Sequence, residues 1–551
     1  MKIYENKKNL LGKYLPPSSV IPLFAVHMPE EVDAPLLQTL HSGYIGQGPK
    51  VEEFEGILKN FFGNKNVLTL NSGTSAIHLA LRLAGIKPGD EVISTPMTCS
   101  ASNVPILAHY ADIVWADVDP RNGLIDPLDV ERKITSNTKA ILCVDWAGTP
   151  CDVDKLMEIG KKYNIKVIED SAHAFGATYK DKMVGNLADF TCFSLQAIKH
   201  ITTVDGGLLL TKSSNDHDKG KILRWYGIDR EATNKDSRIE IDILDWGYKF
   251  HMNDVTATIG IVQMNFIEKI LVAHRANAKF YSEEINNPFI AHASTGWSQN
   301  STFWIYTILL PTSELRMKFM EYMKENGIMT SRVHGRNDIH ATFARFARNL
   351  PGVTEFDSRQ ISIPVHWKLT VEQRQRIVDL CNQFGKERIT SANTTVTRAY
   401  LKPVENLEEA LLMSEIRNEC AKFMTHFTAK IDAAQQVNWY LNAYKKLAEA
   451  KEMLCYLLYK SDGKAIGFGV VRFMDKKYWL TGGIVEKERG QEFGQLLFEQ
   501  LIALTPSDEV WLDVLTTNKA GIHVYDKLGF TEVQKAKNDK GKKLIVMKLL
   551  K

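Results

Sequence analysis

Lys199 occupies an unusual place for a lysine, between the short apolar run FTCFS (190–194) and the polar turn TTVDGG (202–207). Most lysines in proteins are solvated, and a solvated lysine needs no such setting. A lysine amine at the end of a buried strand is well placed to form a covalent bond with an aldehyde. The position of Lys199 therefore suggests covalent chemistry.

Two further features add to this reading. Asp170 ends the apolar run KVIED, and Gly73, Thr74 and Ser75 begin a helical pattern in NSGTSAIHLAL. The first turn of a helix offers free N–H groups and the positive end of its dipole, which suit a phosphate. Each feature alone has an ordinary explanation, as a helix cap or a turn residue. Together they supply the lysine, the carboxylate and the phosphate cradle that pyridoxal phosphate (PLP) requires.

A second candidate site lies near the C-terminus. The stretch GGIVEKERGQEFGQLLFEQLI predicts a strand, a glycine-containing turn and a helix with an apolar face. The backbone N–H groups from Arg489 to Gln495 would form a nest for a pyrophosphate, although an ordinary strand–turn–helix has the same pattern. The strand VWLDVLTTN and the segment NKAGIHVYDKLGF follow it.

The composition is that of a globular protein with more than one domain. The chain has 551 residues, 44% of them hydrophobic and 24% charged, and its net charge of +3 gives no reason to expect a nucleic-acid or membrane partner. The N-terminal residues lack the apolar core of a signal peptide, and no apolar run reaches the ~20 residues of a membrane span. The seven scattered cysteines form no CxxC pair. We expect a reduced, cytoplasmic protein without disulfides or a metal site.

Short apolar runs alternate with helical patterns between residues 64 and 215, which predicts an α/β fold with a mostly parallel sheet. Ligands of such sheets bind at the carboxyl ends of the strands. Residues 255–285 are expected to form one long helix. We predict a large domain over about 20–265, a small α+β domain over 266–385, a linker over 386–397 and an α+β domain over 398–551.

Residues 20–385 resemble the DegT-type sugar aminotransferases, which are fold-type-I PLP enzymes. The similarity lies in GYIGQGPKVEEFE, NSGTSAIHLAL, GDEVISTPMT, IEDSAHAFGA, FSLQAIKHITTVDGG and GYKFHMNDVTATIG. The resemblance implies that Lys199 bonds to the cofactor aldehyde and moves a proton on the substrate, and that Asp170 holds the ring nitrogen protonated. It also implies a homodimer or a higher homo-oligomer with L-glutamate as the amino donor.

The resemblance places the remaining cofactor contacts as well, with some departures from the family. The phosphate would be bound by Gly73, Thr74, Ser75 and Ser194. His173 stands where the family often has a glutamine near the ring hydroxyl. Lys249 replaces an asparagine that reaches the phosphate of the partner subunit, and Cys99 replaces an aromatic residue that stacks on the ring. Because the lysine is present, with His200 as a packed or solvated neighbour, transamination is expected rather than dehydration.

The sugar-nucleotide side of this site is less clear from the sequence. The segment SRVHGRNDIH contains a polar cluster of Arg332, His334, Arg336 and His340. These side chains would either face a diphosphate or sugar, or belong to a solvated loop.

Residues 396–551 resemble the GNAT acetyltransferases. The resemblance implies acetyl-CoA as cosubstrate, a contact from Asn518, and Tyr525 as the acid that protonates the departing thiolate. Glu492 replaces the usual first glycine of the pyrophosphate turn. Asp513 and Glu486 are both candidate bases, and Arg417 and Asn418 resemble the acceptor side. The remaining expected cofactor contacts are Ile484, Val485, Arg489, Gly490, Gln491, Phe493, Gly494 and Gln495.

An aminotransferase makes a primary amine, and an N-acetyltransferase consumes one. We therefore expect a bifunctional enzyme that aminates a nucleotide-linked keto-deoxysugar and then acetylates the new amine, for a surface polysaccharide or a glycosylated metabolite. Two alternatives remain: the GNAT domain acetylates another amine, or it is a CoA-binding module without turnover.

Overall fold

The computed structural model describes residues 20–231, 242–293, 301–385, 399–404, 406–421, 424–425, 430–450, 452–460, 464–538 and 540–550. The chain divides into two compact units, Met1–Gly385 and Lys386–Lys551, and each is described by itself. The expected linker, 386–397, lies outside the described residues.

A seven-stranded sheet organises the first unit, in the order β1-β9-β8-β5-β4-β2-β3. All strands run parallel except β9, which pairs antiparallel with both β1 and β8. The carboxyl ends of the parallel strands therefore meet at one edge, where the predicted site residues follow them. The strands are β1 (Val67–Leu70), β2 (Glu91–Ser94), β3 (Asp112–Trp115), β4 (Thr138–Val144), β5 (Lys166–Asp170), β8 (Phe190–Ser194) and β9 (Gly207–Thr211).

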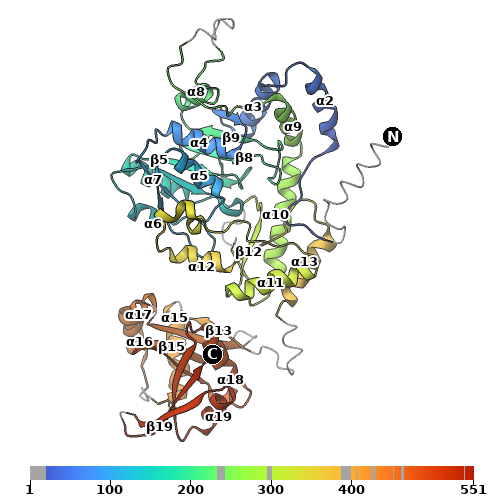
Figure 1. Ribbon diagram of the computed structural model, residues 1–551. Coiled ribbons are helices and arrows are strands. Elements are labelled where there is room, and N and C mark those ends of the chain that lie inside the picture. Colours follow the sequence, from blue (N-terminus) through green and yellow to red (C-terminus); the bar gives the residue numbers. More distant parts are fainter. Residues whose placement is uncertain are drawn as a thin grey trace. The chain divides into compact units, whose positions relative to one another are not determined.

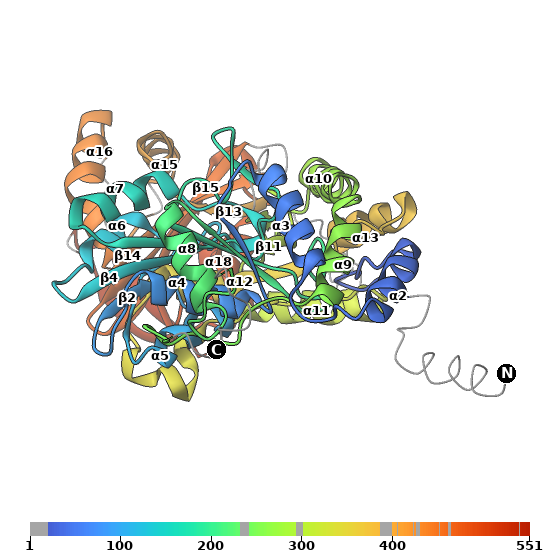
Figure 2. The same cartoon turned by 90° about the horizontal axis from the view of Figure 1, so that it is seen from above.

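Helices cover this sheet because its strands are apolar on both faces (Figures 1 and 2). α4 packs on β8 and β9, and the apolar residues of the central strands form the main core. The helices are α2 (Asp33–His41), α3 (Pro49–Phe62), α4 (Gly73–Leu83), α5 (Ser100–Ala108), α6 (Pro127–Arg132), α7 (Val153–Tyr163) and α8 (Ser214–Leu223). A short two-stranded ribbon, β6 (Thr178–Tyr179) and β7 (Lys182–Met183), stands apart from the sheet.

The prediction of one long helix over 255–285 is wrong. Two helices, α9 (Asp254–Met264) and α10 (Ile267–Glu284), meet at an angle of 59°. The φ of Phe266 at the break is −111°, and its ring packs against His27 at 5.0 Å, so tertiary contact accompanies the bend where the sequence has no glycine or proline. Within the described ranges, no single helix is long and apolar enough to cross a membrane. The bent pair of α9 and α10 together meets this criterion, by length and composition alone.

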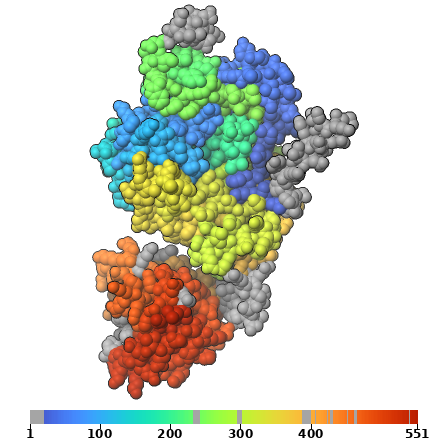
Figure 3. All heavy atoms as spheres, in the orientation of Figure 1, coloured from blue at the N-terminus to red at the C-terminus, as the bar shows by residue number. Residues whose placement is uncertain are grey.

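The rest of the first unit is a small three-stranded antiparallel sheet with its own core. Its segment 337–359 also joins the main core, because Phe343 packs edge-on against Trp115 and Phe356 against Trp146. Figure 3 shows this yellow segment lying against the blue part of the first unit. The elements are β10 (Ala291–His292), β11 (Tyr306–Leu309), β12 (Gln360–Ile363), α11 (Ser313–Glu325), α12 (Pro351–Arg359) and α13 (Val371–Gln383).

The second unit is built on another seven-stranded sheet, in the order β13-β14-β15-β16-β17-β19-β18. Only β16 and β17 pair in parallel. The strands are β13 (Ala399–Pro403), β14 (Met453–Lys460), β15 (Ala465–Met474), β16 (Lys477–Ile484), β17 (Glu509–Leu515), β18 (Thr531–Lys537) and β19 (Lys543–Leu550). The helices are α15 (Leu407–Cys420), α16 (Ala433–Trp439), α17 (Lys445–Glu449), α18 (Phe493–Leu504) and α19 (Lys519–Lys527), with a π-helical turn at Tyr440–Tyr444.

Candidate active sites

Lys199 lies on the loop between β8 and β9, at the carboxyl edge of the large sheet. Its ammonium lies 3.6 Å from the centre of the Trp304 ring. Burial lowers the pKa of Lys199 to about 8, although the negative charge of Asp170 partly opposes this shift. A neutral amine, the form that attacks an aldehyde, is therefore present in useful amounts near neutral pH.

Asp170 ends β5 and is buried, with 5% of its surface exposed. Its Oδ2 accepts a hydrogen bond from Ser102 Oγ at 2.6 Å, and its Oδ1 accepts one from the backbone N–H of Ala172 at 3.1 Å. Burial raises the pKa of Asp170, while the two hydrogen bonds and Lys199 favour the carboxylate. Ser102 gives its only proton to Asp170, so Thr98 Oγ1, 2.8 Å from Ser102 Oγ, must donate to Ser102.

Asn337, from the small-sheet part of the unit, fixes the start of α5. Its Nδ2 donates to the Thr98 carbonyl at 2.8 Å, and its Oδ1 accepts from Asn103 Nδ2 at 2.8 Å. Cys99 is the N-cap residue of α5, and Ser102 lies in its first turn. The predicted ring-facing residue and the partner of Asp170 are therefore held by one anchored helix start.

The predicted phosphate cradle lies where α4 begins beside the end of β8. Ser72 Oγ caps the helix by accepting from the Ser75 N–H at 3.0 Å, and Ser75 Oγ donates to Asn71 Oδ1 at 2.7 Å. A Cβ on Gly73 would lie only 2.9 Å from the Cβ of Ser194. Glycine thus permits Ser194 to approach the helix start, where free N–H groups can bind an anion.

Three nearly parallel aromatic rings lie beside Lys199. His173 stacks on Trp304 with ring centres 3.9 Å apart, and His334 lies 5.5 Å from His173. Burial lowers the pKa of His334 to about 4 and that of His173 well below its usual value, so both rings are neutral. His173 Nδ1 and His334 Nε2 are buried and have no hydrogen-bond partner among the described residues, which leaves both atoms available to a ligand.

The predicted sugar-binding cluster is divided by the structure. His334 faces the Lys199 side, whereas Arg332 forms an ion pair with Asp357. Arg336 pairs with Asp338 at 2.6 Å, and His340 is exposed. The two arginines that sequence reasoning offered to the substrate are therefore engaged by carboxylates, Arg336 by one in its own segment and Arg332 by one on α12.

Lys249 and His200, which the sequence also singled out, are both in contact with neighbouring residues of the first unit. Lys249 Nζ lies 3.9 Å from the centre of the Trp225 ring, and the Lys249 carbonyl accepts from Asn71 Nδ2 at 3.2 Å, next to the cradle. His200 is buried, with Nε2 3.1 Å from the Thr302 carbonyl, so it is a packed residue.

Sequence reasoning missed Trp304, Ser102 and Asn337. Trp304 lies in the apolar run FWIY, which carries no sign of a functional role. Only the fold brings it to Lys199, where its indole N–H also donates to the Ile198 carbonyl at 2.8 Å. The site as assembled fits PLP: an amine, a buried carboxylate, a helix start and unpartnered ring nitrogens converge.

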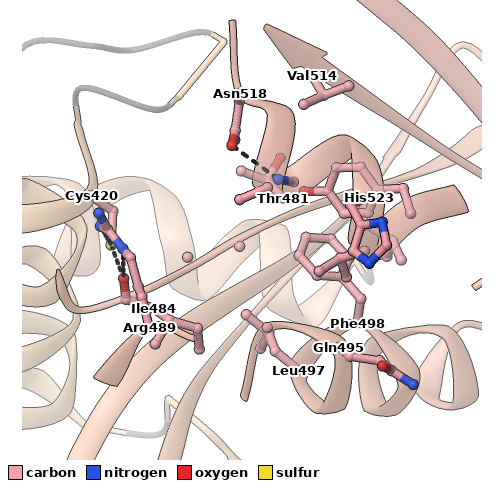
Figure 4. Close-up of a pocket in the computed structure, with 18 of the residues that line it drawn as sticks. Cys420, Thr481, Ile484, Arg489, Gln495, Leu497, Phe498, Val514, Asn518 and His523 are labelled. Atoms are coloured by element: carbon pink, nitrogen blue, oxygen red, sulfur yellow. Dashed lines mark hydrogen bonds between the residues drawn. The ribbon is translucent and has the colours of Figure 1, made fainter. Parts of the chain in front are cut away.

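The second unit contains a cavity of about 410 Å³ between β16 and β17. The two strands pair only at Tyr478↔Val510 and Trp479↔Trp511. Beyond these pairs both strands line the cavity, together with α18 and α19. Figure 4 shows Arg489 and Cys420 at one end of the cavity and His523 and Gln495 at the other.

The backbone conformation of the turn before α18 explains why glycine is usual at this turn in the GNAT acetyltransferases that the sequence resembles. Gly490 has φ +80° and Glu492 has φ +64°, a left-handed conformation that favours glycine. The predicted cofactor contacts that line the cavity are Ile484, Arg489, Gly490, Gly494, Gln495, Asn518 and Tyr525. Val485, Gln491 and Phe493 are not among the lining residues, and Phe493 is buried in the core of the unit.

Tyr525 lies on α19 and is 8% exposed, with its ring edge-on to Phe498 at 4.8 Å. Burial, and to a lesser extent Asp513, raise the pKa of Tyr525, so its hydroxyl carries a proton at neutral pH. Asn518 caps the same helix by accepting from the Gly521 N–H at 3.0 Å. Asn518 and Tyr525 thus reach the cavity from one rigid helix.

Comparisons with known proteins identify a family for each of the two units. Residues 27–382 match the DegT/DnrJ/EryC1/StrS aminotransferase family, and residues 415–530 match the acetyltransferase (GNAT) family. An uncharacterized protein of Methanocaldococcus jannaschii, MJ1066, is 35% identical over 385 residues, which cover 67% of this chain and 97% of the relative. The spore coat polysaccharide biosynthesis protein SpsC of Bacillus subtilis is 37% identical over 234 residues, 42% of this chain and 60% of the relative.

A solved structure shows the same likeness in three dimensions. The putative sugar aminotransferase Spr1654 of Streptococcus pneumoniae, in its PMP-form, superposes with a TM-score of 0.63 at 28% identity and covers 67% of this chain and 99% of its own. The resemblance read from the sequence and the expected α/β fold class are thereby confirmed, with PLP and acetyl-CoA as the cofactors of the two families. The chain therefore belongs to the DegT/DnrJ/EryC1/StrS aminotransferase family, and it carries in addition a C-terminal GNAT acetyltransferase domain.

Proposed function

We propose that the enzyme first aminates a nucleotide-linked keto-deoxysugar, with L-glutamate as amino donor, and then acetylates the new amino group. The observation that carries this proposal is the presence in one chain of the Lys199–Asp170 pair and the cavity between β16 and β17. The first site makes a primary amine from a ketone, and the second is of the kind that consumes a primary amine. The relation to a polysaccharide biosynthesis protein supports a sugar destined for a surface polysaccharide.

In the first site, bound PLP would supply an aldehyde and a ring that withdraws electrons from a neighbouring carbon atom. Asp170 would keep a proton on the ring nitrogen, because Ser102 and the Ala172 N–H hold it as a carboxylate facing the site. Lys199, once its amine is released, would carry a proton between the substrate carbon and the cofactor carbon that exchange the amino group. The start of α4 with Thr74, Ser75 and Ser194 would hold the phosphate, and His173, whose Nδ1 has no partner among the described residues, would lie near the ring hydroxyl.

We also propose a cytoplasmic homodimer. Leu37, Leu40, Tyr44 and Ile45 form an exposed apolar stretch on and after α2, which a second copy of the chain would cover. In such a dimer Lys249 would reach the partner's phosphate. The cysteines are all free thiols, which suits a reducing compartment.

The experiment that tests the proposed function is incubation of the purified enzyme with dTDP- and UDP-linked keto-deoxysugars, L-glutamate and acetyl-CoA, followed by mass analysis. We expect one sugar to gain first an amino group and then an acetyl group. Amination without acetylation would refute the second step and favour either another amine acceptor or a CoA-binding role. Absence of amination of any sugar by the PLP-loaded enzyme would refute the proposed substrate class.

A further inference from the structure

Two carboxylates lie among the described residues of the acetyltransferase cavity, Glu492 and Asp513. Glu492 belongs to the turn before α18, at the end of the cavity suited to a pyrophosphate. Asp513 lies on β17, two residues beyond the last pair with β16. Glu486, which the sequence offered as an equal candidate base, is not a lining residue. Asp513 is therefore the carboxylate at the point where the two strands separate.

Asp513 also lies near the expected acid. Its negative charge contributes to the raised pKa of Tyr525, which lines the same cavity from α19. A base on β17 and an acid on α19 would approach a thioester held between the strands from two different elements. An acetyl transfer needs such a pair, because the attacking amine loses a proton and the departing thiolate gains one.

The carboxylate of Asp513 is held in place by residues from elsewhere in the domain. Thr425 Oγ1 donates a hydrogen bond to Asp513 Oδ1. The Thr425 carbonyl in turn accepts from Asn538 Nδ2 at 2.6 Å, and Asn538 lies in the turn between β18 and β19. The backbone of Asp513 is fixed by pairing with Val546 in β19. The orientation of this side chain is thus determined before any ligand binds.

A cysteine in the same cavity offers a different chemistry, transfer through an acetylated enzyme. Cys420 is buried, and its thiol donates to the Ile484 carbonyl at 3.4 Å. Burial raises the pKa of Cys420 in spite of the nearby Arg489, so at neutral pH it is a thiol and a poor nucleophile. Direct attack by the amine is therefore favoured over a cysteine intermediate.

We infer that Asp513 is the base that accepts the proton of the acceptor amine during acetyl transfer. This inference rests on the proposed acetyltransferase step. The amine nitrogen attacks the thioester carbonyl carbon; the C–N bond forms and the C–S bond breaks. One amine proton passes to Asp513, and Tyr525 gives its proton to the sulfur of CoA. Exchange with water returns the proton from Asp513 to Tyr525, so that no other reactant is consumed.

The test compares Asp513→Asn with the wild-type enzyme. The asparagine keeps the shape and the acceptor oxygen that Thr425 needs, but it is not a base. We expect kcat for acetyl transfer to fall about 10²- to 10³-fold, while the Kd for acetyl-CoA, measured by calorimetry, stays within about twofold. Glu486→Gln is the matched control and should keep wild-type kcat. Thr425→Val removes one hydrogen bond to the Asp513 carboxylate and should lower kcat about tenfold. This variant replaces Asp513→Asn as the test if Asp513→Asn does not fold.

Two acceptors separate this inference from the proposed function: free glucosamine, and the aminated sugar nucleotide made by the first domain. If the wild-type enzyme acetylates glucosamine but not the aminated sugar nucleotide, the proposed sequence of steps is refuted. A comparison of Asp513→Asn with the wild-type enzyme, with glucosamine as acceptor, would then still test whether Asp513 is the base. Wild-type kcat in Asp513→Asn would overturn the assignment of Asp513. An acetyl group found on Cys420 by mass analysis would also overturn it, and acetylation of neither acceptor would remove both proposals.

Discussion

The two domains build their sites from different parts of the polypeptide. The aminotransferase site consists of buried polar side chains, in which Thr98, Ser102 and Asp170 form one hydrogen-bonded chain facing Lys199. The expected pyrophosphate nest of the acetyltransferase site is instead made of main-chain N–H groups, in the turn before α18, which borders the cavity between β16 and β17. Tyr525 and Asp513, the proposed acid and base, line this cavity together with Cys420 and His523.

This difference determines how each site tolerates substitution. A side-chain site depends on residue type, because an unpaired buried charge or donor is costly. A main-chain site depends on backbone conformation, so Glu492 can replace a glycine as long as its φ of +64° is maintained. Substitutions of reactive side chains should therefore have large effects in both domains, and substitutions in the turn should have small ones.

The largest expected effect is that of Lys199→Arg. A guanidinium keeps the positive charge but cannot bond to the aldehyde, and transamination should fall by at least about 10⁴-fold. Visible absorption of the PLP-loaded protein should lose the band of the lysine-bound cofactor. Acetyl-CoA binding by the second domain is the internal control, and a variant with residual transamination above one per cent would contradict the role of Lys199.

Tyr525→Phe should have the second-largest effect on activity. Phenylalanine keeps the contact with Phe498 but removes the proton donor, so kcat for acetyl transfer should fall about 10²-fold. Steady-state assays with glucosamine as acceptor would measure this. An unchanged rate would show that the acid lies elsewhere, whereas no acetyl transfer by the wild-type enzyme to any amine would favour a CoA-binding module without turnover.

Ser102→Ala should lower transamination about tenfold, because it removes a hydrogen bond to the buried carboxylate of Asp170. That bond favours the ionised form, so without it the pKa of Asp170 rises further. The acidic limb of the pH–rate profile should consequently move to higher pH. Ser102→Thr, which keeps the hydroxyl, is the matched control, and an unshifted limb in Ser102→Ala would show that Ser102 merely fills space.

The lowered pKa of Lys199 predicts the pH dependence of cofactor capture. Because the pKa is about 8, the neutral amine fraction rises about tenfold per pH unit below that value and then levels off. The rate at which PLP-free enzyme binds PLP covalently, followed by absorbance, should show the same profile. A rate that keeps rising to about pH 10 would mean that Lys199 titrates as a solvated lysine.

The smallest effect is expected for Glu492→Gly. Glycine adopts the left-handed conformation of residue 492 at a cost about 1 kcal/mol lower than glutamate does, which stabilises the folded state. It also adds conformational entropy to the unfolded chain, so the free energy of unfolding should change by less than about 1 kcal/mol. Loss of the negative charge at the pyrophosphate turn should tighten acetyl-CoA binding a few-fold. Calorimetry and thermal unfolding measure both, and weaker binding would mean that the Glu492 side chain itself contacts the cofactor.

The sequence was most informative where function lies at strand ends. Asp170 ends β5 and Lys199 follows β8, and parallel strands bring such positions to one edge. Ser102, Trp304 and Asn337 come from segments whose meeting depends on tertiary packing, so no local pattern marks them. The same packing pairs Arg332 with Asp357 and bends the chain at Phe266, whereas Arg336 pairs with Asp338 only two residues away.

We propose that one nitrogen atom passes through both sites of this chain. The most direct measurement supplies the enzyme with a keto-deoxysugar nucleotide, ¹⁵N-labelled L-glutamate and ¹³C-labelled acetyl-CoA, and follows the products by mass over time. We predict a ¹⁵N-amino sugar that appears first and then a product in which the ¹³C-acetyl group is bound to that ¹⁵N. A ¹⁵N-amino sugar that accumulates without a ¹³C-acetyl group would contradict the claim.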